Sequence, residues 1–196
     1  MEVIPTVVDL DRYSVRPAPP RNYKMVGWIG APATVRYLEL VAEAMKVISQ
    51  EIAVQLRVIG ANFSVAGVQT EIRRWTQESE VAEIQDIDVG IMPLTDSPWE
   101  RGKCGYKLVQ YMACGKPVIA SPVGINKEMV RPAINGFLAK DTGEWIAALR
   151  ILLADADLRR SMGAEGRTVV EQKYNLQVTT PRLAQLFHQV LTRESV

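Results

Sequence analysis

Two lysines and a glycine lie close together at the start of the stretch Trp99–Gly124, where they could hold a phosphate group. Lys103, Gly105 and Lys107 flank the point near Tyr106 at which the sequence predicts that a helix begins. The first turn of a helix exposes unpaired backbone N–H groups and a positive potential. Glycine lets the backbone approach a ligand closely, and the two ammonium groups add charge. Together these residues predict a seat for a phosphate or diphosphate.

A purely structural interpretation of the same residues is also open. Lys103 and Lys107 could keep a loop soluble while Gly105 makes a tight turn, because lysine is usually exposed whatever its role. The residue types alone do not decide between the two interpretations.

The histidine, cysteine and aspartate side chains give little support for other kinds of catalytic site. His188 is the only histidine, so neither a Ser/His/Asp site nor a histidine metal site can be built without it. Cys104 and Cys114 lack the spacings of a disulfide framework or a zinc site. The pattern D-x-D can chelate a cation bound to a diphosphate, but it occurs at residues 86–88 and at two other places. We therefore expect no metal.

The composition indicates one globular domain with neither a large net charge nor a membrane-spanning segment. The chain has 196 residues, 47% of them hydrophobic, which is enough for one substantial core. Its 23 basic and 22 acidic side chains leave a net charge of +1, and aromatic residues make up only 7%, so binding to nucleic acid is not predicted. No apolar run is long enough to span a membrane, and the cysteine usage fits a reducing cytosol.

Short apolar runs, several of them followed by glycine, alternate with helical patterns along the chain. Strands are expected within residues 24–30, 54–62, 67–75, 89–94, 117–124 and 135–139. Helices are expected within residues 35–49, 78–88, 108–114, 125–130, 144–154, 156–174 and 183–193.

This alternation predicts an α/β fold with a doubly wound parallel sheet, Rossmann-like, and helices on both faces. Ligands of such sheets bind beyond the carboxyl ends of the strands. Gly30, Gly60, Gly124 and the loop Thr95–Gly105 all follow predicted strands, so they should gather at one edge of the sheet. That edge is the predicted binding site. Only helical patterns follow Gly143, which predicts long C-terminal helices.

A resemblance to a known family begins in residues 107–124. They read KLVQYMACGKPVIASPVG, which is similar to the pattern K-L-x-E-Y-M-A-x-G-x-P-V-I-A-x-x-x-G of group-1 (GT4-type) glycosyltransferases. Further segments resemble the same family in the same order and extend the likeness over residues 24–190: GWIGAPATVRYLELV, DIDVGIMPL, NGFLA, and LRRSMGAEGR with KYN. Several colinear segments are more specific than any single motif.

The resemblance implies the C-terminal half of a two-domain GT-B architecture, the half that binds the nucleotide-sugar donor. Residues 1–23, which are rich in proline, would then be a linker from an N-terminal acceptor domain in the same parent chain. Residues 24–176 would form the nucleotide-sugar-binding domain, and residues 177–196 a crossover helix. The resemblance also implies a retaining transferase of hexosyltransferase type that uses a nucleotide-diphosphate sugar as donor substrate and needs no metal or other cofactor.

The same resemblance implies a role in surface-polysaccharide or lipopolysaccharide assembly. It leads us to expect a cytoplasmic protein and leaves open a peripheral association of the full-length protein with the inner face of the cytoplasmic membrane. We expect a monomer, and we expect the isolated domain to be inactive because the acceptor side of the cleft is missing. An alternative from another class stays open, a non-catalytic nucleotide-binding or interaction module derived from this fold.

The resemblance assigns roles to residues that the chemistry had already singled out. Lys107 matches the family lysine near the donor diphosphate, and Gly30 matches the close-approach glycine after the first strand. The loop amides that cradle the donor match Cys104, Gly105, Tyr106, Lys107 and Leu108, with Lys103 as a second cation beside them.

Two glutamates of the family pattern are absent, and their positions are taken by Gly102 and Gln110. Gln110 can still form hydrogen bonds to ribose hydroxyls, but it lacks the carboxylate charge, so that contact should be weaker. Gly102 has no side chain. Either Glu100 supplies the missing sugar contact, or the donor sugar is held differently.

Overall fold

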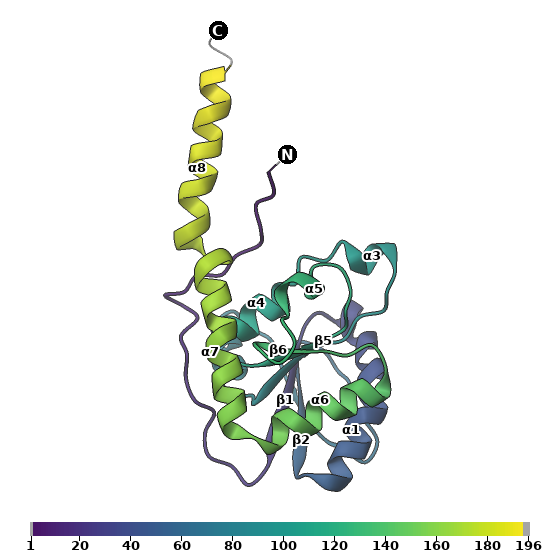
Figure 1. The fold of residues 1–196 in the computed structure, drawn as a ribbon. Coiled ribbons are helices and arrows are strands. Elements are labelled where there is room, and N and C mark those ends of the chain that lie inside the picture. The colour runs from purple at the N-terminus through teal and green to yellow at the C-terminus, as the bar shows by residue number, and fades with distance from the viewer. Residues whose placement is uncertain (1, 194–196) are drawn as a thin grey trace.

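The computed structural model describes residues 2–193 of the chain (Figure 1). In this part of the chain, six strands form one parallel sheet in the order β3-β2-β1-β4-β5-β6. The strands are β1 (Lys24–Ile29), β2 (Val54–Ile59), β3 (Gln69–Arg73), β4 (Val89–Met92), β5 (Val118–Ala120) and β6 (Gly136–Leu138). Each lies within a predicted strand, and the predicted α/β doubly wound fold is confirmed.

Helices cover both faces of the sheet and continue beyond its last strand. They are the 3-10 helix η1 (Pro32–Leu38), α1 (Glu39–Glu51), α2 (Glu80–Gln85), α3 (Pro98–Arg101), α4 (Tyr106–Ala113), α5 (Asn126–Met129), α6 (Thr142–Ala154), α7 (Ala156–Lys173) and α8 (Leu176–Arg193). Helices α1 and α6 pack together on one face, and α4 and α7 pack together on the other (Figure 1).

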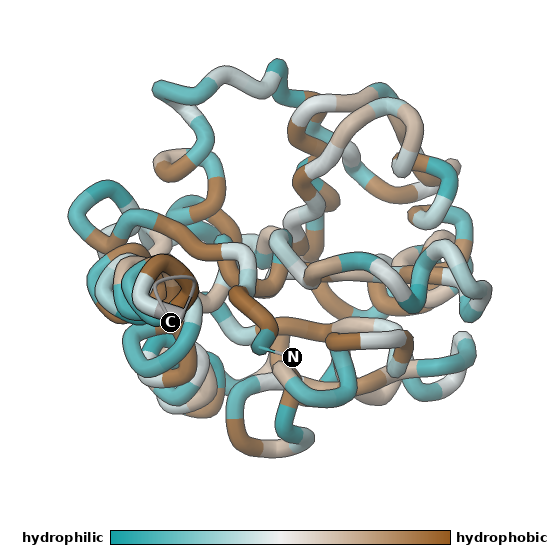
Figure 2. The backbone as a smooth tube through the Cα atoms, turned by 90° about the horizontal axis from the view of Figure 1, so that it is seen from above, coloured by the Kyte–Doolittle hydropathy of each residue, from teal (hydrophilic) through white to brown (hydrophobic). Residues whose placement is uncertain are grey.

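The side chains of β1 show how the core divides into two layers. Val26 and Trp28 pack with α1 and α6, whereas Met25 and Ile29 pack with α4. Successive side chains of a strand point to opposite faces, so a run that is apolar at nearly every position is buried on both. Hydrophobic stretches of backbone accordingly concentrate in the middle of the molecule, with mostly hydrophilic loops around them (Figure 2).

The strands β1 and β4 separate toward their carboxyl ends, and a tyrosine fills the gap. Ladder pairing stops at Gly27 and Gly90, although each strand continues for two more residues. The Tyr111 hydroxyl accepts a hydrogen bond from the Ile29 N–H at 3.0 Å and donates one to the Ile91 carbonyl at 3.3 Å. A continued parallel ladder would join these two backbone groups directly. The tyrosine therefore keeps the strands apart at the point where the strand order reverses.

We expect Tyr111→Phe to lower the free energy of unfolding by about 2–4 kcal/mol, because it leaves a buried N–H and a buried carbonyl without partners. The Tyr111 side chain is fully buried, so water cannot easily replace the hydroxyl. Urea denaturation measures the change. Tyr174→Phe is the matched control, since no hydrogen bond of the Tyr174 hydroxyl is seen within residues 2–193. A similar loss of stability in both variants would contradict the bridging role.

The charged loop between residues 95 and 105 contains a short helix that the sequence interpretation missed. Helix α3 begins at Pro98, a position where the missing proline N–H is not needed for a helical hydrogen bond. Four residues are too few to produce a hydrophobic period, so the pattern carried no helix signal.

Helix α8 begins earlier than the sequence pattern indicated. The Asn175 side chain accepts a hydrogen bond from the Val178 N–H at 2.9 Å and so caps a helix that starts at Leu176. Pro181 therefore lies inside the helix. Residues 194–196, the end of the crossover helix that the resemblance implied, lie outside the described residues. Helix α8 projects away from the sheet (Figure 1), and Phe187 on it is exposed. Within residues 2–193, no helix combines the length and hydrophobicity needed to cross a bilayer.

The extended segment before β1 is fixed to the domain at several points, of which Val8 and Tyr13 lie nearest the start of the chain. Val8 forms an isolated bridge with Asn175, and its N–H donates to the Tyr174 carbonyl at 3.0 Å. Tyr13 is 2% exposed and packs into the core layer that contains α4. The segment is extended as its prolines predicted, but it contributes to the core.

Candidate functional site

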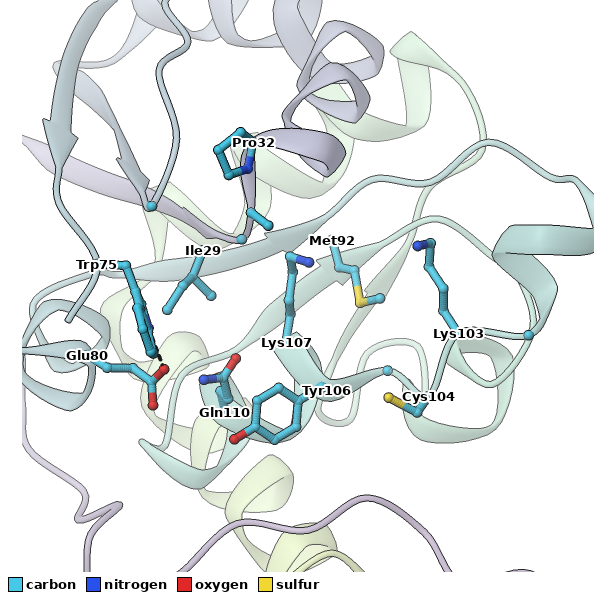
Figure 3. A pocket seen from close by; sticks show the side chains of 15 residues that line it. Ile29, Pro32, Trp75, Glu80, Met92, Lys103, Cys104, Tyr106, Lys107 and Gln110 are labelled. Carbon is cyan, nitrogen blue, oxygen red and sulfur yellow. Dashed lines mark hydrogen bonds between the residues drawn. The ribbon is translucent and has the colours of Figure 1, made fainter. Parts of the chain in front are cut away.

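A cavity of about 680 Å³ opens at the carboxyl ends of β1, β2 and β4, beside the point where the strand order reverses. This is the edge at which the sequence predicts a site, and the volume suits a ligand of nucleotide size. The cavity is lined by Ile29, Gly30, Ala31, Pro32, Gly60, Trp75, Glu80, Met92, Gly102, Lys103, Cys104, Gly105, Tyr106, Lys107 and Gln110 (Figure 3).

Most of the residues that the sequence singled out meet in this lining. They are Gly30, Lys103, Cys104, Gly105, Tyr106, Lys107 and Gln110. Leu108 is instead fully buried, and its N–H donates to the Gly105 carbonyl at 2.9 Å. Neither its side chain nor its amide is therefore available to a ligand in this structure.

Glu100, one of the two alternatives for the missing sugar contact, lies outside the cavity lining. Its side chain is buried at 3% exposure and accepts hydrogen bonds from the Ser97 and Tyr37 hydroxyls. These two hydroxyls lower the pKa of the Glu100 carboxyl. The formation of α3 turns this position inward, so the carboxylate holds the loop together and is not placed to contact a donor sugar.

Gly105 places the start of α4 against the cavity. It adopts the left-handed conformation with φ of +72°, which favours glycine. A Cβ atom there would lie 2.6 Å from the Met129 sulfur, so the glycine is also needed for packing against α5. The next two amides, of Tyr106 and Lys107, belong to the first helical turn and have no backbone acceptor within the described chain. They are available to an anion in the cavity.

Lys107 extends from α4 across the end of β1. Its ammonium nitrogen lies 5.4 Å from the centre of the Trp28 ring, and a Cβ atom on Gly30 would come within 2.9 Å of its Cε. The same Cβ atom would lie 2.6 Å from the Trp28 ring, so the glycine at position 30 makes room for both the tryptophan and the lysine. Burial, reinforced by the neighbouring positive charge of Lys103, lowers the pKa of Lys107 to about 8. A bound anion would offset both effects.

Lys103 forms the second cationic part of the cavity. Its ammonium nitrogen lies 5.7 Å from the Tyr37 ring centre and 5.9 Å from the Trp99 ring centre. Within residues 2–193, neither Lys103 nor Lys107 forms an ion pair with a carboxylate. The two ammonium groups therefore leave positive charge in the cavity that a ligand can neutralise.

The opposite side of the cavity combines an aromatic ring with hydrogen-bonding groups (Figure 3). The Trp75 indole N–H donates to the Glu80 carboxylate at 2.7 Å. The Tyr13 hydroxyl also donates to Glu80, and it accepts from the Gln110 amide at 3.1 Å. Trp75 is half exposed, whereas Glu80 is buried at 5% exposure. A carboxylate and an amide are thus fixed beside an indole ring that a planar group could contact.

Trp75 and Glu80 were not predicted as site residues. Trp75 follows β3, so the rule that places ligands at carboxyl ends of strands could have identified it. Glu80 lies on the short helix α2, and its sequence neighbourhood carries no comparable signal.

No cluster of three or more histidine, cysteine, aspartate or glutamate side chains that could hold a metal ion is found in residues 2–193. The D-x-D pattern at residues 86–88 lies at the other end of the sheet. There Asp88 accepts a hydrogen bond from the Met25 N–H at 2.7 Å, and Asp86 pairs with Arg57 at 2.7 Å. Its carboxylates have structural partners away from the cavity.

The fold and the cavity define a Rossmann-like α/β domain with a ligand-sized site at the switch point of its sheet. The chain belongs to the family Glycosyl transferases group 1, whose model matches residues 23–155. The resemblance seen in the sequence is therefore confirmed, and the chain is a member of a transferase family.

Two solved structures share the fold over nearly the whole chain, and a further relative is similar in sequence over a shorter part of it. Sucrose-phosphate synthase from Thermosynechococcus elongatus superposes with a TM-score of 0.82 at 22% identity and covers 98% of this chain. HepE from Anabaena, solved with UDP and glucose, gives a TM-score of 0.77 at 16% identity and 95% coverage. TuaH of Bacillus subtilis strain 168, a glycosyltransferase provisionally named for teichuronic acid biosynthesis, is 30% identical over 71 residues, or 34% of this chain.

The match covers only part of each of these proteins. It spans 18% of TuaH, 53% of the sucrose-phosphate synthase chain and 56% of the HepE chain. At identities below 25% the two solved structures establish the fold of this chain and no more.

Proposed function

We propose that the chain is the donor-binding domain of a glycosyltransferase and that its cavity holds a nucleotide-diphosphate sugar. The observation that carries this proposal is the cavity itself, in which unpaired ammonium groups and free helix N–H groups face a side made of an indole ring, a carboxylate and an amide. A diphosphate matches the ammonium and N–H groups, and a nucleoside matches the side with the indole ring, the carboxylate and the amide.

The proposed binding mode follows from these two sides of the cavity. The diphosphate lies beside Lys103, Lys107 and the first amides of α4, and the nucleoside lies toward Trp75 and Gln110. The sugar then lies toward Gly102, where the missing side chain leaves space. During transfer, the bond between the anomeric carbon and the diphosphate oxygen breaks while a bond to the acceptor oxygen forms, and the proton of the acceptor hydroxyl passes to the leaving diphosphate. Negative charge grows on the leaving diphosphate, and the fixed cations stabilise it.

We propose a retaining hexosyltransferase, as the family resemblance implies. We also propose that it needs no metal, because the two lysines and the helix terminus can supply the positive charge that a metal would otherwise give. We also propose a UDP-type donor, supported by the complex of HepE with UDP, and a role in surface-polysaccharide assembly, supported by the name of TuaH. The acceptor side of the full-length protein would come from another domain of the parent chain.

A non-catalytic nucleotide-binding module is the second candidate. It is favoured by Gly102 and Gln110, which stand where the family pattern has glutamates. Such a module would bind a nucleotide sugar without transferring or hydrolysing it, even when the full-length protein is assayed.

Calorimetric titration tests the proposal. UDP, GDP and ADP are titrated into the chain with a metal chelator present, and one of them is expected to bind with saturation. Adding Mg²⁺ in place of the chelator is expected to leave the affinity unchanged. Absence of binding for all three nucleotides at millimolar concentration would overturn the donor-site assignment.

We further expect the affinity for the nucleoside diphosphate to fall about tenfold between pH 7 and pH 9. Lys107, with its pKa lowered to about 8, is mostly charged at the lower pH and mostly neutral at the higher one. The diphosphate binds the charged form, so binding above pH 8 requires uptake of a proton. Lys107→Arg keeps its charge throughout this range and should flatten the profile. An unchanged slope in that variant would contradict the role of Lys107.

A further inference from the structure

A second cavity, of about 610 Å³, lies at the opposite end of the sheet. Its walls are the segment 15–24, residues just before β4 and β5, and the N-terminal half of α7. All strands are parallel, so this cavity lies at their amino ends while the first lies at their carboxyl ends. The two sites are therefore separate.

Basic side chains dominate the second cavity. Seven of its lining residues are arginine or lysine and only one, Asp88, is acidic. Four of the seven are engaged in ion pairs. The other three, Arg16, Lys24 and Lys116, form no ion pair with any residue in the described part of the chain. The chain as a whole carries a net charge of only +1, so this is a local concentration of positive charge.

Lys116 is the central feature of the cavity because its charge is buried. The residue is 5% exposed, and its ammonium group donates one hydrogen bond, to the Arg16 carbonyl at 3.1 Å. An ammonium group has three donors, and a buried charge is costly when no carboxylate pairs with it directly. Asp86 and Asp88 act on the Lys116 charge only from beyond ion-pair distance. Burial accordingly lowers the pKa of Lys116. A neutral side chain could tether the segment to the domain at a smaller cost, so tethering alone does not account for a lysine here.

Two arginines form a rigid part of the wall. Arg159 donates to the carbonyls of Leu152 and Leu153, and Arg167 donates to those of Tyr13 and Ala113. The carbonyl groups fix the guanidinium groups in place, and each guanidinium is also near one carboxylate, Arg159 at 4.0 Å from Asp88 and Arg167 at 2.7 Å from Glu171. The positive wall is thus organised before any ligand arrives, which reduces the entropy lost on binding.

The remaining surface of the cavity is apolar. Pro17, Pro19 and Pro20 line it from the segment before β1, and Pro117 lines it from the start of β5. Proline rings are stiff and offer a flat hydrophobic surface. A ligand that fits the whole cavity must therefore join an anionic group to an apolar body.

We propose that this second cavity binds a small soluble organic phosphate, with its phosphate beside Lys116, Arg16 and Lys24 and its apolar part against the prolines. The ligand also connects the segment 15–21 to α7, because both line the cavity. This proposal does not depend on the function proposed for the first cavity.

Nuclear magnetic resonance titration with phenyl phosphate tests the proposal. Saturable shifts are expected for amides in residues 15–24 and 156–167, with weaker binding of inorganic phosphate, which lacks the apolar part. Lys116→Met, which keeps the length of the side chain, is expected to weaken binding about tenfold or more. Arg16→Ala is a second variant at an exposed position, where folding is not at risk.

Lys107→Met is the matched control, since it removes a lysine from the first cavity and should leave these shifts unchanged. The proposal is overturned if the shifts do not saturate or if they appear only in residues 102–110. It is also overturned if phenyl phosphate binds with the same affinity to Lys116→Met and Arg16→Ala as to the native chain.

Discussion

Lys107→Met is expected to weaken the binding of a nucleoside diphosphate by about 10- to 100-fold. The substitution removes the partly buried ammonium group but keeps an unbranched apolar stem that can pack over Trp28. The loss should lie in the charge-assisted contact with the diphosphate, so a nucleoside without phosphates should bind the native chain and the variant equally weakly. Calorimetric titration of both ligands measures the difference.

Stability measurements separate this effect from misfolding. Lys107 carries a lowered pKa because its charge is buried, so a neutral residue there should leave the free energy of unfolding unchanged or higher. Lys127→Met is the matched control, because Lys127 is an exposed lysine outside the cavity lining. Equal diphosphate affinity in the native chain and Lys107→Met would rule out this lysine as the diphosphate contact.

The second large effect is expected at the nucleoside side of the cavity. There the Tyr13 hydroxyl donates a hydrogen bond to Glu80 and accepts one from Gln110, so it links these two side chains. The Glu80 carboxylate accepts from Tyr13 and Trp75 and pairs with Arg12 at 3.4 Å, but its two oxygens can accept further hydrogen bonds, and it lines the cavity. We expect it to accept hydrogen bonds from the ribose hydroxyls and so to supply the charge that Gln110 lacks.

The expected result is that the ribonucleotide UDP binds about tenfold more tightly than its 2′-deoxy analogue and that Glu80→Gln largely removes this difference. A merely structural role of Glu80 would weaken both nucleotides to the same extent. Gln110→Ala gives a comparison at the neighbouring position. If the native chain binds both nucleotides equally, the predicted contact between Glu80 and the ribose is contradicted. The proposal that the cavity is a donor site is not affected by that result.

The fold and part of the site could be predicted from the sequence because they depend on local patterns. Short apolar runs followed by turns identified the strands, and the alternation with helices fixed a parallel sheet and hence the edge that carries the cavity. Lys103 and Lys107 were found because charged residues around a glycine at a helix start are visible in the sequence itself. The family pattern in residues 107–124 is likewise local.

The tertiary structure alone decided where the other polar side chains lie. Tyr13 and Gln110 meet residues 75 and 80 through hydrogen bonds although these three parts of the chain are far apart in sequence, and no sequence period encodes such a meeting. Glu100 looked available for a sugar, but the short helix α3 turns it toward Tyr37 and Ser97.

The sequence by itself thus determined the class of fold, the edge of the sheet that holds the cavity and the family. Only the tertiary structure decided that Lys107 is buried enough to titrate near pH 8, and that Lys116 is buried in a second basic cavity. The physical reason is that periodicity and turn residues report which face of an element is covered. The environment of one charge depends instead on side chains that packing brings from distant parts of the chain.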